Sequence, residues 1–253
     1  MRRPGGNAAV SLYLLAGMLF FFCAGLPAQD KCNVEVKVLL PPAETQNAVV
    51  ALKAKKETAS RVYFFDTNSL ELLSQGVIVR LRRTAQSELT IKLRSPTGRK
   101  LNPYAESGDD FKCEVDQTEE GAVFSYSMRK RYVSEEPPQT GNEVFRLLSA
   151  GQKKLLRDAQ ASVDWTRVQR IVEVKSSAWQ GQAQPHLGRL ALELWEWQGG
   201  KILELSTRVS SEAGSSAYAE LRQLMETKRL SVSPTQRPKT TIVLQSVAHV
   251  APP

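Results

Sequence analysis

The sequence predicts an α+β protein that is mostly antiparallel β, with helices packed outside a barrel or a strongly curved sheet. About eight short segments alternate apolar and polar residues, which is the pattern of a strand with one buried face. Three other segments place apolar residues at helical spacing, and each such helix needs an apolar surface to cover. So many half-buried strands in one chain favour a barrel.

The first 28 residues have the order of a secretory signal peptide. Arg2 and Arg3 supply positive charge, residues 8–24 are almost wholly apolar, and Ala28 offers a small residue for cleavage. A membrane anchor left in place is the alternative, although the apolar run is slightly short of the roughly 20 residues that a spanning helix needs. We expect an exported protein, either periplasmic or secreted, with no membrane contact after cleavage.

The rest of the chain divides into one domain and a tail. Residues 29–230 carry the strand and helix patterns and are long enough to bury a core. Residues 231–253 are rich in Ser, Thr and Pro. We expect this C-terminal tail to be peripheral, with residues 240–247 forming an added edge strand.

Eight segments have the alternation of strands, and they are separated by helices and loops. The predicted strands lie near residues 33–38, 77–82, 89–94, 111–116, 125–131, 173–175, 190–194 and 204–208. The predicted helices are residues 45–56, residues 143–159 with Gly151 as a possible break, and residues 215–229.

The charge and the cysteines narrow the class of protein. The chain has a net charge of +8, and +6 remains without the first 28 residues. This surplus suits an anionic ligand, although many proteins simply have a basic surface. Of the three cysteines, Cys23 lies in the signal segment, which leaves Cys32 and Cys113. In an oxidising compartment this pair predicts a disulfide, and two buried thiols that never meet are the alternative.

The usual catalytic motifs are absent from the sequence. There is no glycine-rich phosphate loop and no G-x-S-x-G nucleophile elbow. The two histidines, His186 and His249, lack the spacing of metal ligands, which argues against a histidine-based hydrolase or a zinc enzyme. Aromatic residues make up only 7% of the chain, so we expect no nucleic-acid partner.

The polar faces of the strands carry both basic and acidic residues. An open sheet with a solvated charged side is the common explanation of such a pattern. The helices favour another arrangement, because helices that cover the apolar face from outside turn the charged face inward. The charges would then line a tunnel.

One block of sequence resembles the signature of the CYTH family, the triphosphate tunnel proteins. It runs from Tyr63-Phe64-Phe65-Asp66-Thr67 through Gly76 to Arg80-Leu81-Arg82. Weaker matches extend the resemblance from Asn33 to Leu224. Asn33-Val34-Glu35-Val36-Lys37 is similar to the family's E-x-E-x-K strand. The remaining matches are Thr90-Ile91-Lys92, Lys112-Cys113-Glu114-Val115-Asp116, Arg129-Lys130-Arg131, Leu192-Glu193-Leu194 and Ile202-Leu203-Glu204-Leu205-Ser206.

The resemblance implies an eight-stranded, closed, antiparallel tunnel that binds a small triphosphate-like anion with Mg²⁺ or Mn²⁺. Arginine suits phosphate because it makes bidentate, charge-assisted contacts, and carboxylates suit these hard cations. The resemblance assigns phosphate binding to Lys37, Arg80, Arg82, Lys92, Arg129 and Arg131. It assigns metal binding to Glu35, Glu114, Glu193 and Glu204, and catalysis to Glu35 and Lys37.

Two positions depart from the family pattern and keep the function open. Asn33 stands in place of the first glutamate of E-x-E-x-K, and Ser206 stands in place of the last glutamate of the late acidic strand. Hydrolysis of inorganic triphosphate or a related phosphoanhydride is one function that fits. The others are a non-catalytic polyanion-binding module on the same tunnel, and a structural envelope protein with a degenerate tunnel.

Overall fold

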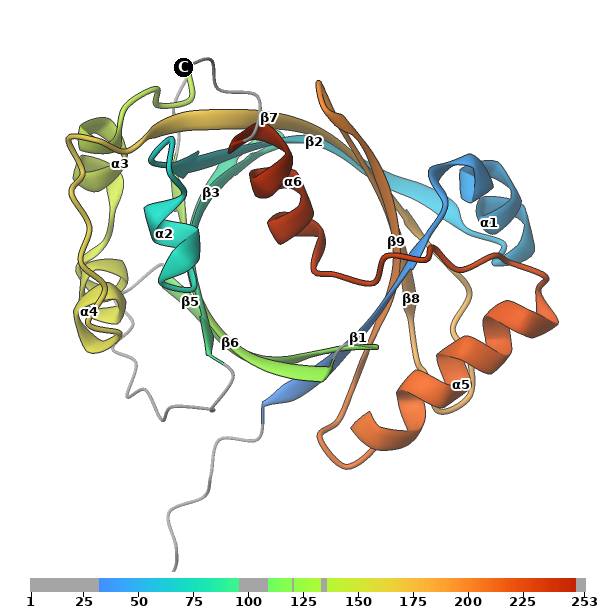
Figure 1. Cartoon of the computed structure of the whole chain (residues 1–253). Helices are drawn as coiled ribbons and strands as arrows, with labels where there is room; N and C mark the ends of the chain where they lie inside the picture. The colour runs from blue at the N-terminus through green and yellow to red at the C-terminus, as the bar shows by residue number, and fades with distance from the viewer. Residues whose placement is uncertain (1–31, 96–108, 120, 133–135, 249–253) are drawn as a thin grey trace, which may run out of the picture.

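The computed structural model describes residues 32–95, 109–119, 121–132 and 136–248. Within them nine strands close into one barrel in the order β1-β5-β6-β4-β3-β2-β7-β8-β9, seen end-on in Figure 1. The strands are β1 (Asn33–Leu40), β2 (Lys55–Asp66), β3 (Val77–Arg83), β4 (Ser87–Ser95), β5 (Asp109–Thr118), β6 (Gly121–Tyr132), β7 (Gln169–Gln180), β8 (Leu190–Trp197) and β9 (Gly200–Val209). The predicted signal segment, residues 1–28, lies outside the described residues.

The closed, mostly antiparallel barrel confirms the predicted fold class, but the predicted number of eight strands is wrong. The additional strand is β2. It gives no alternation signal because Val62, Tyr63, Phe64 and Phe65 are all buried, two facing the barrel interior and two facing the outer core. One pairing is parallel: Asn33–Val36 of β1 lie beside Glu114–Gln117 of β5.

Helices cover the outer face of the barrel on two sides (Figure 1). The described helices are α1 (Thr45–Ala51), α2 (Glu71–Ser74), α3 (Gly141–Leu147), α4 (Ala150–Asp158), α5 (Gly214–Thr227) and α6 (Lys239–Ala248), with a 3₁₀ turn η1 (Pro42–Glu44). Helices α1 and α5 share a core cluster with β1, β8 and β9, and α3 and α4 share another with β2, β3, β4 and β6. The apolar faces of these strands therefore point outward.

The three predicted helices exist with corrected boundaries. The first ends at Ala51, because β2 begins at Lys55. The second is two helices that are divided at Leu148–Ser149 and not at Gly151. Ser149 begins α4 by accepting a hydrogen bond from the backbone N–H of Gln152 at 3.0 Å, and this cap defines the break.

The C-terminal tail differs most from its predicted structure. Residues 239–248 form helix α6, which lies across one end of the barrel (Figure 1), so the predicted edge strand is wrong. Val243 and Leu244 are buried against Phe64 and Trp195, which face the interior at that end. The β-branched composition of the segment concealed the helix, because tertiary packing outweighs weak local propensity.

The linker to α6 is tied to the first strand of the barrel. The side-chain amide of Gln236 accepts a hydrogen bond from the Leu39 N–H at 2.9 Å and donates one to the Leu39 carbonyl at 3.0 Å. Gln236 is buried, and the Leu39 carbonyl also accepts a hydrogen bond from the Ser233 N–H at 2.8 Å. The described part of the tail, up to residue 248, thus packs on the barrel.

None of the described helices is both long enough and apolar enough to span a membrane.

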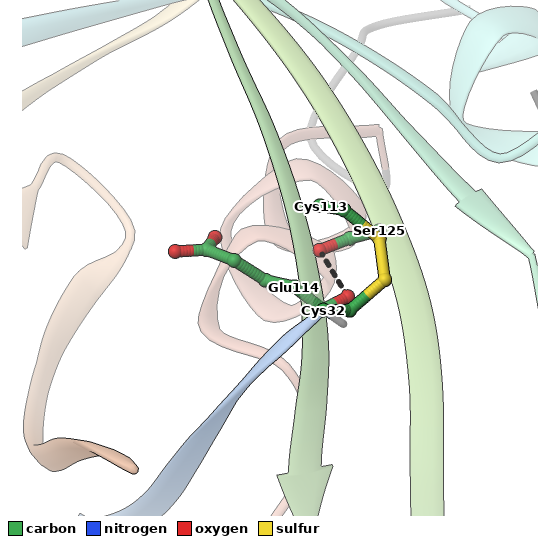
Figure 2. Close-up of a disulfide and its surroundings, with 4 residues drawn as sticks. All are labelled: Cys32, Cys113, Glu114 and Ser125. Carbon is green, nitrogen blue, oxygen red and sulfur yellow. Dashed lines mark hydrogen bonds between the residues drawn. A yellow bond between two sulfur atoms is a disulfide. The ribbon is translucent and has the colours of Figure 1, made fainter. Parts of the chain in front are cut away.

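Cys32 and Cys113 form a disulfide, as the sequence predicted. The bond joins the residue before β1 to β5, beside the parallel pair (Figure 2). In Figure 2 the Glu114 side chain points to the opposite side of β5 from the disulfide. The bond therefore fastens the barrel from outside without occupying its interior.

We expect removal of this disulfide by Cys32→Ser with Cys113→Ser to lower the free energy of unfolding by roughly 4 kcal/mol, because the bond closes a loop of 81 residues. Urea unfolding of both proteins measures the difference. Thiol titration of the unreduced, denatured protein without residues 1–28 should find neither Cys32 nor Cys113 reactive. Two reactive thiols would contradict the bond.

Candidate functional site

The charged end of the barrel interior holds a cavity of about 880 Å³. The structure brings all ten residues that the resemblance assigned into its lining: Glu35, Lys37, Arg80, Arg82, Lys92, Glu114, Arg129, Arg131, Glu193 and Glu204. These side chains come from β1, β3, β4, β5, β6, β8 and β9. The charged face thus points inward, and the open sheet with a solvated charged side is wrong.

The Phe-Asp-Thr block has a structural part in this arrangement. Asp66 is buried at the end of β2, and its carboxylate accepts hydrogen bonds from the backbone N–H groups of Thr67, Leu72 and Leu73 at 2.7, 2.9 and 3.0 Å. It therefore fixes the turn into α2, just before β3 brings Arg80 and Arg82 into the cavity.

Arg80 is the cation with the poorest compensation in the cavity. Its Nε atom is buried without a hydrogen-bond partner, and no carboxylate among the described residues lies within 4.0 Å of its guanidinium. Burial, together with the neighbouring charge of Arg82, lowers the pKa of Arg80 to about 10, so it is still charged at neutral pH. A buried charge without a partner is costly, which indicates a place shaped for an anion.

The other arginines are partly compensated. Arg82 lies 2.9 Å from a carboxylate oxygen of Glu193. Arg129 lies 3.3 Å from Glu88 and also pairs with Asp110. Arg131 is exposed and lines the same cavity. The four arginines therefore all offer donors to the cavity, and Arg131 is the exposed one.

Asp116 organises the lysines of the cavity, although the sequence did not assign it to the site. Its two oxygens lie 2.6 Å from Lys37 Nζ and 3.0 Å from Lys92 Nζ. Burial alone raises the pKa of Asp116, but these two lysines outweigh it and hold the pKa well below its usual range. Burial, with repulsion from Lys37, lowers the pKa of Lys92 to about 8. The signal that could have identified Asp116 is its position two residues after Glu114, because residues two apart on a strand lie on the same face.

Three carboxylates at this side of the cavity form a candidate metal site. Glu35, Glu114 and Asp116 each offer an oxygen, and these three oxygens lie within 4.8 Å of one another. Carboxylate oxygens are the ligands that Mg²⁺ and Mn²⁺ prefer, so the donor chemistry fits. Two cations already contact these carboxylates: Arg208, which is 58% exposed, bridges Glu35 and Glu114 at 3.0 and 3.2 Å. Lys37, which is 13% exposed, lies 2.8 Å from Glu35 and 2.6 Å from Asp116.

Glu193 and Glu204 have a different partner. They face each other across the β8–β9 pair, and both contact Lys239 of α6, Glu204 at 2.8 Å. Neither belongs to the group of three carboxylates around Glu35. The sequence did not predict Lys239 as a site residue, because it lies in the tail and not on an alternating strand.

The barrel with its charged interior resembles solved structures over most of its length. A candidate adenylyl cyclase from Hippeastrum, in which triphosphatase activity is dominant, superposes with a TM-score of 0.57 at 16% identity, covering 84% of this chain and 94% of that one. A candidate adenylate cyclase from Bacillus halodurans gives a TM-score of 0.55 at 16% identity, covering 84% and 97%. This chain has the triphosphate tunnel fold. The likeness confirms the fold that the CYTH resemblance implied, with nine strands in the tunnel.

Neither a protein-family model nor a curated protein matches the sequence. The tunnel fold is therefore evident from the structure and not from a sequence match.

Proposed function

We propose that the protein binds the phosphate chain of inorganic triphosphate, or of a related phosphoanhydride, in its tunnel and hydrolyses it with Mg²⁺ or Mn²⁺. The observation that carries this proposal is the buried Nε of Arg80, which has no hydrogen-bond partner, with Arg82, Arg129 and Arg131 lining the same cavity. A phosphate chain is the ligand whose closely spaced negative charges match such a set.

Each group of the cavity has a distinct part in the proposed reaction. Arg80 and Arg82 bind phosphate oxygens and neutralise the charge that spreads over them in the transition state. Lys37 remains an ammonium, because Glu35 and Asp116 outweigh its burial and raise its pKa. It therefore orients the chain and does not transfer a proton.

Glu35, Glu114 and Asp116 would hold the divalent ion, which supplies charge neutralisation and an activated water. Burial raises the pKa of Glu35, but Lys37 and Arg208 outweigh it and bring the pKa to about 2. A carboxylate this acidic is a poor base at neutral pH. Glu35 is therefore proposed as a ligand rather than as the group that accepts a proton.

A non-catalytic phosphate-binding module is the second candidate. Asn33 and Ser206 remove two carboxylates from the family pattern, and Lys239 occupies two of those that remain. The basic set of the cavity is thus more complete than the acidic set. Such a protein would bind triphosphate and release it unchanged.

We further propose that the protein is exported, on the basis of its N-terminal segment and its disulfide. Nucleoside triphosphates are scarce outside the cytoplasm, so polyphosphate or another extracellular phosphoester is the more suitable ligand.

Titration calorimetry with tripolyphosphate, followed by an assay of released phosphate with Mg²⁺, Mn²⁺ or EDTA, tests the proposal. We expect binding, and phosphate release only in the presence of a divalent ion. Binding without release under every condition would favour the non-catalytic module. Absence of binding would refute both.

A further inference from the structure

Lys239 lies between two buried carboxylates, which would otherwise need a cation from solution to neutralise them. Glu193 and Glu204 are directly opposite on β8 and β9, and both side chains are largely buried, at 17% and 6% exposure. Like charges directly opposite on neighbouring strands repel each other, and burial strengthens the repulsion. The pair therefore requires a cation between its carboxylates.

The chain itself supplies that cation. Lys239 Nζ contacts both Glu193 and Glu204, and its side chain is only 12% exposed. Arg82 also pairs with Glu193, at 2.9 Å. Two cations thus balance two carboxylates, and the pKa of Glu193 lies well below its usual range because Lys239 and Arg82 outweigh the effect of burial.

The position of Lys239 in its helix is unfavourable without those carboxylates. Lys239 begins α6, and a cation in the first turn of a helix opposes the helix dipole. Its ammonium lies 4.4 Å from the centroid of the buried Trp195 ring, and this cation–π contact offsets part of that cost. The packing of Val243 and Leu244 into the barrel end and the bonds of Gln236 to Leu39 hold this lysine in place.

Both carboxylate groups of the tunnel hold an enclosed lysine, but they differ in the number of carboxylates and in their second cation. Lys37, which is 13% exposed, lies 2.8 Å from Glu35 and 2.6 Å from Asp116. Arg208, which bridges Glu35 and Glu114, is 58% exposed and can be displaced. Lys239 is enclosed and is carried by a packed helix. A divalent ion that displaces Arg208 would therefore meet three carboxylates around Glu35 with Lys37 still in place, whereas both carboxylates around Lys239 are already neutralised.

We propose that Lys239 is a built-in counter-cation that fills the Glu193–Glu204 pair, so that the tunnel binds one divalent ion and α6 takes the place of a second. This inference rests on the metal site of the proposed function, and it specifies how that site operates. The phosphate chain then lies between one exchangeable ion and one fixed ammonium.

Counting bound Mn²⁺ by electron paramagnetic resonance, without any phosphate ligand, tests this inference. We expect one Mn²⁺ per wild-type chain and two per Lys239→Met chain, because methionine keeps the apolar stem over Trp195 and removes the charge. The second Mn²⁺ should quench tryptophan fluorescence further, since it binds beside Trp195. Two Mn²⁺ ions in the wild type, none in the wild type, or one in the variant would each overturn the inference.

Two further variants keep the test decisive. Lys201→Met removes an exposed lysine from the same strand pair, where it contacts Glu196 at 2.6 Å, and should still bind one Mn²⁺. Glu204→Gln in the wild-type background should also leave one Mn²⁺ with unchanged affinity. A site lost in Glu204→Gln would show that a metal, and not Lys239, occupies the pair. If tripolyphosphate fails to bind, the proposed function falls while these counts still decide the inference.

Discussion

Arg80→Met is expected to weaken tripolyphosphate binding at least about 30-fold while leaving the fold intact or making it more stable. The guanidinium has no carboxylate partner among the described residues, so its charge contributes to ligand binding and not to folding. Loss of a buried, charge-assisted contact costs about 2–5 kcal/mol of binding free energy. Replacing an uncompensated buried cation by an apolar side chain removes a desolvation cost of about 1–3 kcal/mol.

Calorimetry with tripolyphosphate and urea unfolding measure the two effects of Arg80→Met in parallel. Arg61→Met is the matched control, since Arg61 lies on β2, is 58% exposed and pairs with Glu173 outside the cavity. It should change neither quantity appreciably. Unchanged affinity in Arg80→Met, or in the double variant Arg80→Ala with Arg82→Ala, would remove the tunnel as the binding site.

Asp116→Asn, unlike Arg80→Met, is expected to lower the free energy of unfolding strongly. Asp116 neutralises Lys37 and Lys92 and lies 3.7 Å from Arg94 Nε, so the amide leaves these cations uncompensated in the interior. Removal of one partner of a buried ion pair costs about 3–5 kcal/mol. The variant should also bind Mn²⁺ more weakly, because one of three carboxylate ligands is gone.

The pH dependence of metal-free protein distinguishes this explanation from a packing defect. Because the folded-state pKa of Asp116 lies below its unfolded value of 3.8, its contribution is fully present above about pH 4. It is lost as the pH falls through the folded-state pKa. The stability difference between wild type and Asp116→Asn should therefore shrink below pH 4. A difference independent of pH would contradict the electrostatic assignment.

Asp158→Asn is the control for that measurement. Asp158 pairs with Lys154 one helical turn away on α4, with the carboxylate 29% exposed. Such surface pairs contribute about 0.5 kcal/mol, so this variant should resemble the wild type across the pH range. A loss as large as that of Asp116→Asn would show that the change of acid to amide acts by another route.

Alternation predicted the strands whose two faces differ and missed the one whose faces do not. In β3, Val77, Val79 and Leu81 pack under the helices, while Arg80 and Arg82 line the cavity, and the pattern shows this directly. In β2 the interior positions Val62 and Phe64 are as apolar as the exterior ones, because α6 covers that end of the barrel. Period-two patterns report the contrast between faces, not the strand itself.

The site was predictable to the extent that it lies on alternating strands. The family-like positions on seven strands do line one cavity. What the sequence could not show is which charges neutralise one another, since Lys37 and Asp116 are 79 residues apart and Lys239 and Glu193 are 46 apart. The ion pairs within the tunnel depend on the register of the strands and on the path of α6, and local sequence patterns predict neither.

The position of β1 between β5 and β9 also constrains the order in which the barrel assembles. The β9 edge of β1 pairs Glu35 with Arg208, 173 residues later, so this edge stays open until the last strand has formed. The disulfide spans only 81 residues and joins β1 to β5, which are both made early. Oxidation therefore shortens the search for the first strand, since loop closure costs more entropy as the loop lengthens. We expect the reduced chain to refold more slowly than the oxidised one, with β1 as the last strand to pair.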